Sequence, residues 1–61
     1  SDLDPGNYAK YYFGYLEFLE LKKAAIAKWG EDFSQKRFHK FVLDIGPAPF
    51  DLLRDELKQT S

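Results

Sequence analysis

The sequence predicts an all-α fold in which one long helix is followed by two short helices that pack back on it. Three observations carry this prediction. Residues 8–29 hold no proline and a single glycine, Gly30 and Gly46 interrupt the apolar helical patterns, and Ser34 precedes a second such pattern. Because 61 residues allow one small domain at most and no cysteine is present, we expect a single helical segment held together by packing alone.

The first helix is expected at about residues 6–29. It follows a Pro-Gly-Asn turn at residues 5–7, with Asp4 placed to cap the first free N–H groups. Leu, Glu, Lys and Ala dominate its second half and are strong helix formers, while Gly30 occupies the usual position after the last turn. Helical spacing places one apolar set on a common face that we expect to turn inward: Tyr8, Tyr12, Tyr15, Leu19 and Ile26. Tyr11, Phe18 and Trp29 extend this face sideways.

The second helix is expected at about residues 35–45. Ser34 can accept a hydrogen bond from the backbone of the next turn, and so cap the helix. Phe33 and Phe38 flank that cap at the spacing of a hydrophobic staple. Gly46 is expected to end the helix.

The third helix is expected at about residues 49–58. It follows the stiff connector Pro47-Ala48-Pro49, since proline fixes φ and removes a backbone donor. Helical spacing turns three apolar side chains inward: Phe50, Leu53 and Leu57. The tail from Lys58 to Ser61 is expected to fray.

The first helix carries more apolar surface than two short helices can cover, because it is roughly 33 Å long at 1.5 Å per residue. Phe13 and Leu16 point away from its expected inner face. Gly14, Leu21 and Ala25 widen the apolar stripe on another side. A helix that is apolar nearly all round is normally buried nearly all round. We therefore predict a partner surface, with scattered surface aromatics as the alternative.

The sequence offers no catalytic or metal-binding set of its own. Zinc takes three or four ligands, whereas His39 is the only histidine and there is no cysteine. No serine stands in a nucleophile-elbow pattern and no glycine-rich loop could hold phosphate. The basic doublets at residues 22–23 and 36–37 are too short for a nucleic-acid stripe. We therefore expect no nucleic-acid partner. No apolar run approaches the ~18 residues of a membrane span, so we also expect no membrane crossing.

An ordered set of residues runs through nearly the whole chain: Pro5-Gly6, Tyr11, Gly14, Trp29-Gly30, Phe33, Phe38-His39, Gly46 and Pro49. In this order and spacing the chain resembles the C-terminal segment of the bacterial "domain of unknown function 885" proteins. The resemblance implies a large helical parent protein, a zinc-dependent peptidase of the HExxH gluzincin type, often exported or lipid-anchored at the bacterial cell envelope.

The resemblance also implies that the parent protein binds zinc in one part and completes its cleft with another, which is this chain. The zinc ligands would lie upstream, so this chain would carry no cofactor and would be inactive alone while completing the cleft. Tyr11 matches a recurring tyrosine of the family and is thereby implied as a catalytic residue that stabilises the tetrahedral intermediate. His39 is implied as a packing or hydrogen-bonding residue.

Two kinds of partner fit the Tyr/Phe-rich first helix. One is the remainder of the parent catalytic domain, which follows from the resemblance. The other belongs to a different class of protein, an autonomous three-helix interaction module that binds a partner helix or a second copy of itself. An HExxH-containing chain upstream in the same gene would favour the first reading over the second.

Overall fold

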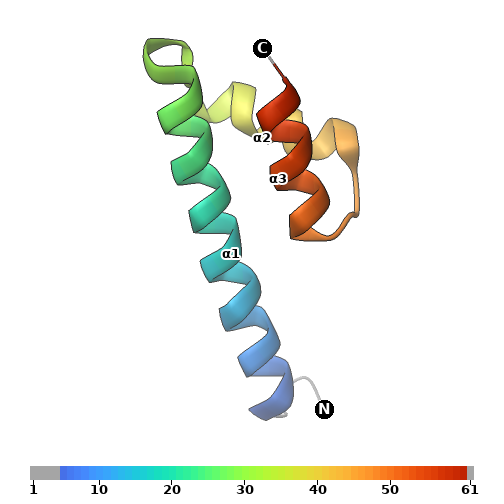
Figure 1. Cartoon of the computed structure of the whole chain (residues 1–61). Coiled ribbons are helices and arrows are strands. Elements are labelled where there is room, and N and C mark those ends of the chain that lie inside the picture. The colour runs from blue at the N-terminus through green and yellow to red at the C-terminus, as the bar shows by residue number, and fades with distance from the viewer. Residues whose placement is uncertain (1–4, 61) are drawn as a thin grey trace.

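The computed structural model describes residues 5–60 and confirms the all-α prediction of one long and two short helices. Helix α1 (Pro5–Trp29) is followed by a 3-10 turn, η1 (Gly30–Asp32), then by α2 (Gln35–Ile45) and α3 (Phe50–Gln59). Helix α3 runs beside the upper half of α1, and α2 crosses behind α3 near the same end (Figure 1). No strand occurs between residues 5 and 60.

Both breaks between helices fall on glycine, as the sequence indicates. Gly30 has φ +56° and Gly46 has φ +81°, in the half of backbone space that glycine enters without a steric penalty. The N–H of Gly46 donates to the carbonyl of Val42 over 3.1 Å and closes the last turn of α2. Each glycine thus ends a helix and redirects the chain toward the next one.

The start of α2 also confirms the local prediction. The hydroxyl of Ser34 accepts a hydrogen bond from the backbone N–H of Arg37 over 3.0 Å. The rings of Phe33 and Phe38 lie on either side of this cap with centroids 6.2 Å apart. Cap and staple together fix where α2 begins and the angle at which it leaves η1.

The end of α3 differs from expectation. We expected fraying from Lys58, yet the helix continues to Gln59, and the N–H of Thr60 donates to the carbonyl of Glu56 over 3.0 Å. Lys28 on α1 adds a hydrogen bond from its Nζ to the carbonyl of Lys58 over 3.0 Å, which satisfies one of the free C-terminal acceptors. The expected cap Asp4 and the terminal Ser61 lie outside the described residues.

The core lies where the three helices meet, and α1 contributes to it only from its second half. Leu21 and Phe38 are fully buried, and the ring of Phe18 packs on Phe38 with centroids 5.3 Å apart. The buried set consists of Leu21, Ala25, Trp29, Phe38, Leu53 and Leu57.

Trp29 joins the end of α1 to the elements that follow it. Its ring stacks on Phe33 with centroids 6.2 Å apart and meets Phe41 edge-on at 6.0 Å. The guanidinium of Arg37 covers the ring at 4.0 Å from its centroid, a cation–π contact. The buried indole N–H finds no acceptor among the described residues, which costs about 1–3 kcal/mol for a neutral donor.

The predicted inner face of α1 is wrong at its tyrosines and at Ile26, whereas Phe18 and Trp29, expected to extend that face sideways, pack in the core. Tyr8, Tyr12 and Tyr15 are 56–59% exposed, and Ile26 on the same face is also exposed. The covered stripe lies on the side of Leu21, which we had assigned to a widening of the apolar surface. The physical reason is that α1 is apolar nearly all round, so its periodicity alone does not decide which side two short helices cover.

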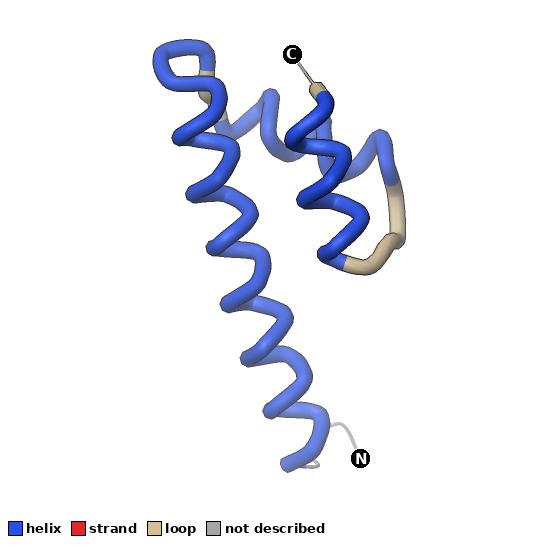
Figure 2. Tube along the Cα trace, viewed as in Figure 1, coloured by secondary structure: helices blue, strands red, loops and turns tan. Residues whose placement is uncertain are grey.

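The molecule is elongated because α1 extends past its two partners. Its radius of gyration is 13.2 Å, against about 10.5 Å for a compact domain of 61 residues. The principal extents are 41 × 18 × 17 Å. The N-terminal half of α1 projects as a rod beyond α2 and α3 (Figure 2).

Candidate functional site

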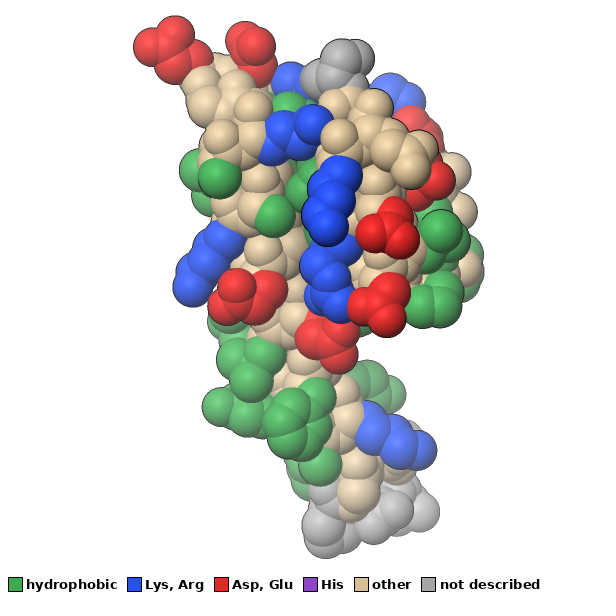
Figure 3. Space-filling model, viewed as in Figure 1, with side chains coloured by type: hydrophobic (Ala, Val, Ile, Leu, Met, Phe, Trp, Pro, Cys, Tyr) green, Lys and Arg blue, Asp and Glu red, His purple; other side chains and the backbone are tan. Residues whose placement is uncertain are grey.

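The projecting half of α1 carries a dense group of exposed apolar side chains. We call residues 8–16 the uncovered segment. Its exposed large apolar residues are Tyr8, Tyr11, Tyr12, Phe13, Tyr15 and Leu16. Apolar side chains gather on this lower part of the molecule in the space-filling view (Figure 3). Six such residues within nine positions exceed the single scattered apolar residues of an ordinary surface, and tyrosine and phenylalanine are typical of interface cores.

One stripe connects the uncovered segment to the core. Its members are three or four residues apart, the spacing that keeps side chains on one face of a helix: Tyr11, Gly14, Phe18, Leu21, Ala25 and Trp29. We call this stripe the seam. The C-terminal four members pack on the other helices, whereas Tyr11 is 76% exposed. The seam therefore continues beyond the last residue that this chain covers.

Gly14 is the narrow point of the seam. Glycine in the middle of a helix is about 0.5–1 kcal/mol less favourable than alanine. A Cβ added at Gly14 would meet no atom within 4 Å, so nothing described in this chain requires a glycine there. The missing side chain at Gly14 leaves a notch in the helix surface. Such a notch suits the close approach of a backbone from outside this chain.

Tyr11 is the sequence-predicted catalytic residue, and it lies at the open end of the seam. Its side chain is the most exposed of the four tyrosines. Between positions 5 and 60, no group of three His, Cys, Asp or Glu residues could hold a metal ion near it or elsewhere. The resemblance places the zinc ligands upstream of this chain, so the catalytic role of Tyr11 stays a prediction.

His39 lies on the exposed side of α2, at the edge of the core. Its ring touches that of Phe38 with centroids 6.1 Å apart. It borders a shallow hollow of about 310 Å³ together with Phe18, Val42 and Leu43. The residue is thus at the edge of the packed region and not inside it.

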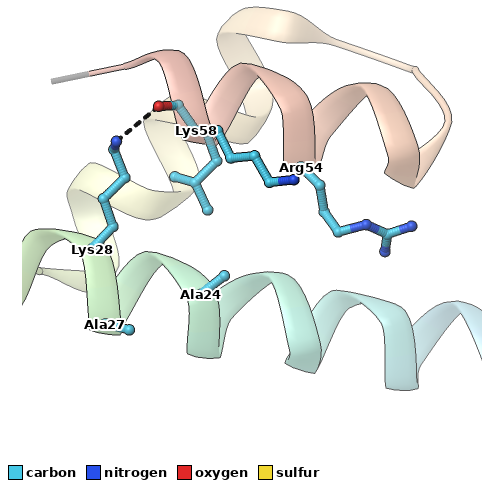
Figure 4. A pocket seen from close by; sticks show the side chains of 6 residues that line it. Ala24, Ala27, Lys28, Arg54 and Lys58 are labelled. Atoms are coloured by element: carbon cyan, nitrogen blue, oxygen red, sulfur yellow. Dashed lines mark hydrogen bonds between the residues drawn. The ribbon is translucent and has the colours of Figure 1, made fainter.

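Sequence reasoning missed a second surface feature, a groove of about 480 Å³ between α1 and α3. It is lined by Ala24, Ala27, Lys28, Arg54, Leu57 and Lys58 (Figure 4). The available signal was a pair of alanines three residues apart facing a pair of cations four residues apart. That signal needs the pairing of α1 with α3, which the sequence does not state. Within residues 5–60, no helix is both long and apolar enough to cross a membrane.

Comparison with known proteins gives one family. The family model described as "Bacterial protein of unknown function (DUF885)" matches residues 3–57, which is nearly the whole chain. No curated protein and no solved structure matches the chain.

Proposed function

The chain belongs to the DUF885 family of bacterial proteins, and we propose that it forms the C-terminal helical part of a larger zinc-dependent peptidase. In this proposal the chain is inactive alone and completes the substrate cleft of its parent. The observation that carries the proposal is the seam of α1, which is covered at one end and open at the other.

The energetics of the uncovered segment support docking onto a larger body. Burial is worth about 1.5–3 kcal/mol for each large apolar side chain that leaves water completely. Six such side chains stand exposed on this segment. An unpacked stretch of helix of this length is also marginal by itself, since isolated helices shorter than about 12–15 residues are barely stable in water. A covering body would remove both costs at once.

The position of Tyr11 on the seam supports its proposed role. A covering body that continues along the seam would meet Tyr11 directly, so the phenol would stand at the interface and not on an outer surface. A phenol O–H there can donate a hydrogen bond to the oxygen that becomes negative as the peptide carbonyl turns tetrahedral. Residues outside this chain would hold the zinc, which supplies Lewis-acid chemistry when bound.

The test is Tyr11→Phe in the full-length parent protein, assayed on peptide substrates. We expect kcat to fall about 10²–10³-fold with little change in KM, since one donor to the developing oxyanion is lost. Tyr12→Phe is the matched control, because it makes the same chemical change one residue away and off the seam. Unchanged turnover in a folded Tyr11→Phe protein would refute the catalytic role.

The autonomous module predicts a different behaviour of the 61-residue chain in solution. If α1 serves self-association, the sedimentation coefficient should rise with concentration, and Phe13→Ala should abolish that rise. A chain that stays monomeric and melts cooperatively would count against self-association. It would leave the missing parent body as the partner of the uncovered segment.

A further inference from the structure

The groove between α1 and α3 joins an apolar floor to a positively charged rim. Ala24 points from α1 toward α3, and Leu57 and Ala27 complete the apolar lining (Figure 4). Lys28, Arg54 and Lys58 stand along the edges. Lys and Arg side chains form a column between the two helices on this face (Figure 3).

The rim keeps hydrogen-bonding capacity after its internal contacts are made. Lys28 donates to the carbonyl of Lys58 over 3.0 Å, which uses one of its three N–H groups. Arg54 pairs with Asp51, and a guanidinium carries five N–H donors. Lys58 forms no ion pair with any described side chain. Of the three cations that line the groove, Arg54 is the one that forms an ion pair with a described carboxylate.

We propose that this groove binds an acidic amphipathic helix of a partner polypeptide. The small side chains of Ala24 and Ala27 would let the backbone of such a helix approach α1 closely. Its apolar stripe would pack on the exposed Ala24 and Ala27, above the already buried Leu57, and Glu or Asp residues beside that stripe would meet the cations of the rim. This is the helix-in-groove mode of recognition, with charge complementarity setting the orientation.

Two features favour a helix over other anionic partners. The floor is apolar, and a phosphate or a nucleic-acid backbone would gain nothing from Ala24, Ala27 and Leu57. Three cations are also too few for the basic stripe that nucleic-acid binding requires. The inference is independent of the peptidase proposal, because the groove shares no residue with the seam positions Tyr11 and Gly14.

The probe is a fluorescein-labelled synthetic helix with Leu and Ala on one face and Glu along both edges of that face. Its matched control carries Gln at every Glu position. We expect the Glu peptide to bind the 61-residue chain more tightly than the Gln peptide, and its binding to weaken with added salt. Fluorescence anisotropy measures both affinities.

Variants of the rim assign the binding to the groove. Lys58→Gln should weaken binding of the Glu peptide roughly threefold, and Lys28→Gln/Lys58→Gln roughly tenfold. Lys36→Gln on the exposed part of α2 is the matched control and should leave the affinity unchanged. Because Lys28 also caps α3, circular dichroism checks that each variant is folded, and Lys58→Gln alone keeps the test valid if the double variant is not.

Three results would overturn the proposal. Equal affinity for the Glu and Gln peptides would exclude charge recognition. Equal loss with Lys36→Gln and Lys58→Gln would place the peptide elsewhere. Dimerisation that disappears in Lys28→Gln/Lys58→Gln, without peptide binding, would assign the groove to a second copy of the chain.

Discussion

The two halves of α1 share one helix and one seam but have opposite surroundings. From Phe18 to Trp29 the seam packs on α2 and α3, and its central members Leu21 and Ala25 are fully buried. From Tyr8 to Leu16 the apolar side chains stand in solvent. Apolar composition does not explain why one half is buried and the other exposed, since the exposed half is the richer in aromatic residues.

Length is what separates them. Helix α1 has 25 residues and α3 has 10, so at 1.5 Å per residue they are roughly 37 Å and 15 Å long. A rod more than twice as long as its neighbour leaves one end bare whatever its sequence. The comparison teaches that an apolar stripe marks what a helix is able to bury, while its neighbours decide how much of it is buried.

The largest expected effect comes from replacing one phenylalanine in the packed region, on α2, and one in the uncovered segment of α1. Phe38→Ala removes a fully buried ring from beneath α1 and should cost about 3–5 kcal/mol, enough to unfold so small a chain. Phe13→Ala makes the same change at a ring that is 61% exposed and should cost at most about 0.5 kcal/mol. Urea denaturation followed by circular dichroism measures both, and similar losses would break the comparison.

A smaller effect is expected at the start of α2. Ser34→Ala removes the acceptor for the N–H of Arg37 and should lower the free energy of unfolding by about 1 kcal/mol. Ser34→Asn preserves a cap and is the control. Amide exchange should quicken in α2 and in residues 18–29 of α1, and stay as fast as before in the uncovered segment. Equal quickening along all of α1 would mean that its halves are not independent.

The smallest effect tests the notch. Gly14→Ala should stabilise the 61-residue chain by about 0.5–1 kcal/mol, since the site has open space for a Cβ. In the full-length parent the same change should lower the melting temperature, because the docked backbone would meet that Cβ. Ala9→Gly, on the same half of α1, reports the propensity effect alone. Stabilisation in both proteins would contradict a close approach at Gly14.

The parts of the fold predicted correctly from the sequence depend on local chemistry. Gly30 and Gly46 end helices because of backbone conformation, and Ser34 begins one through a single hydrogen bond. None of these signals requires knowledge of distant contacts. They place the ends of α1 and α2 within a residue of the structure.

The parts that failed, or that stay predictions, depend on partners. The inner face of α1 was assigned to Tyr8, Tyr12 and Tyr15 because they repeat at helical spacing, yet α3 covers another side. The α1–α3 groove was missed since its two walls are about 30 residues apart in sequence, as the Lys28–Lys58 contact shows. The role of Tyr11 stays a prediction, because the groups it would act with lie outside this chain.

The placement of Trp29 has a practical consequence for spectroscopy. It is the only tryptophan, and it is 7% exposed at the junction of α1, η1 and α2, whereas all four tyrosines lie on the bare end of α1. The tryptophan therefore reports on the packed region, and the tyrosines report on the uncovered segment. Tryptophan emission should follow cooperative unfolding of the packed end, while tyrosine absorbance should shift when a binding partner covers the other. Unmodified protein therefore supplies one optical signal for folding and a second for docking.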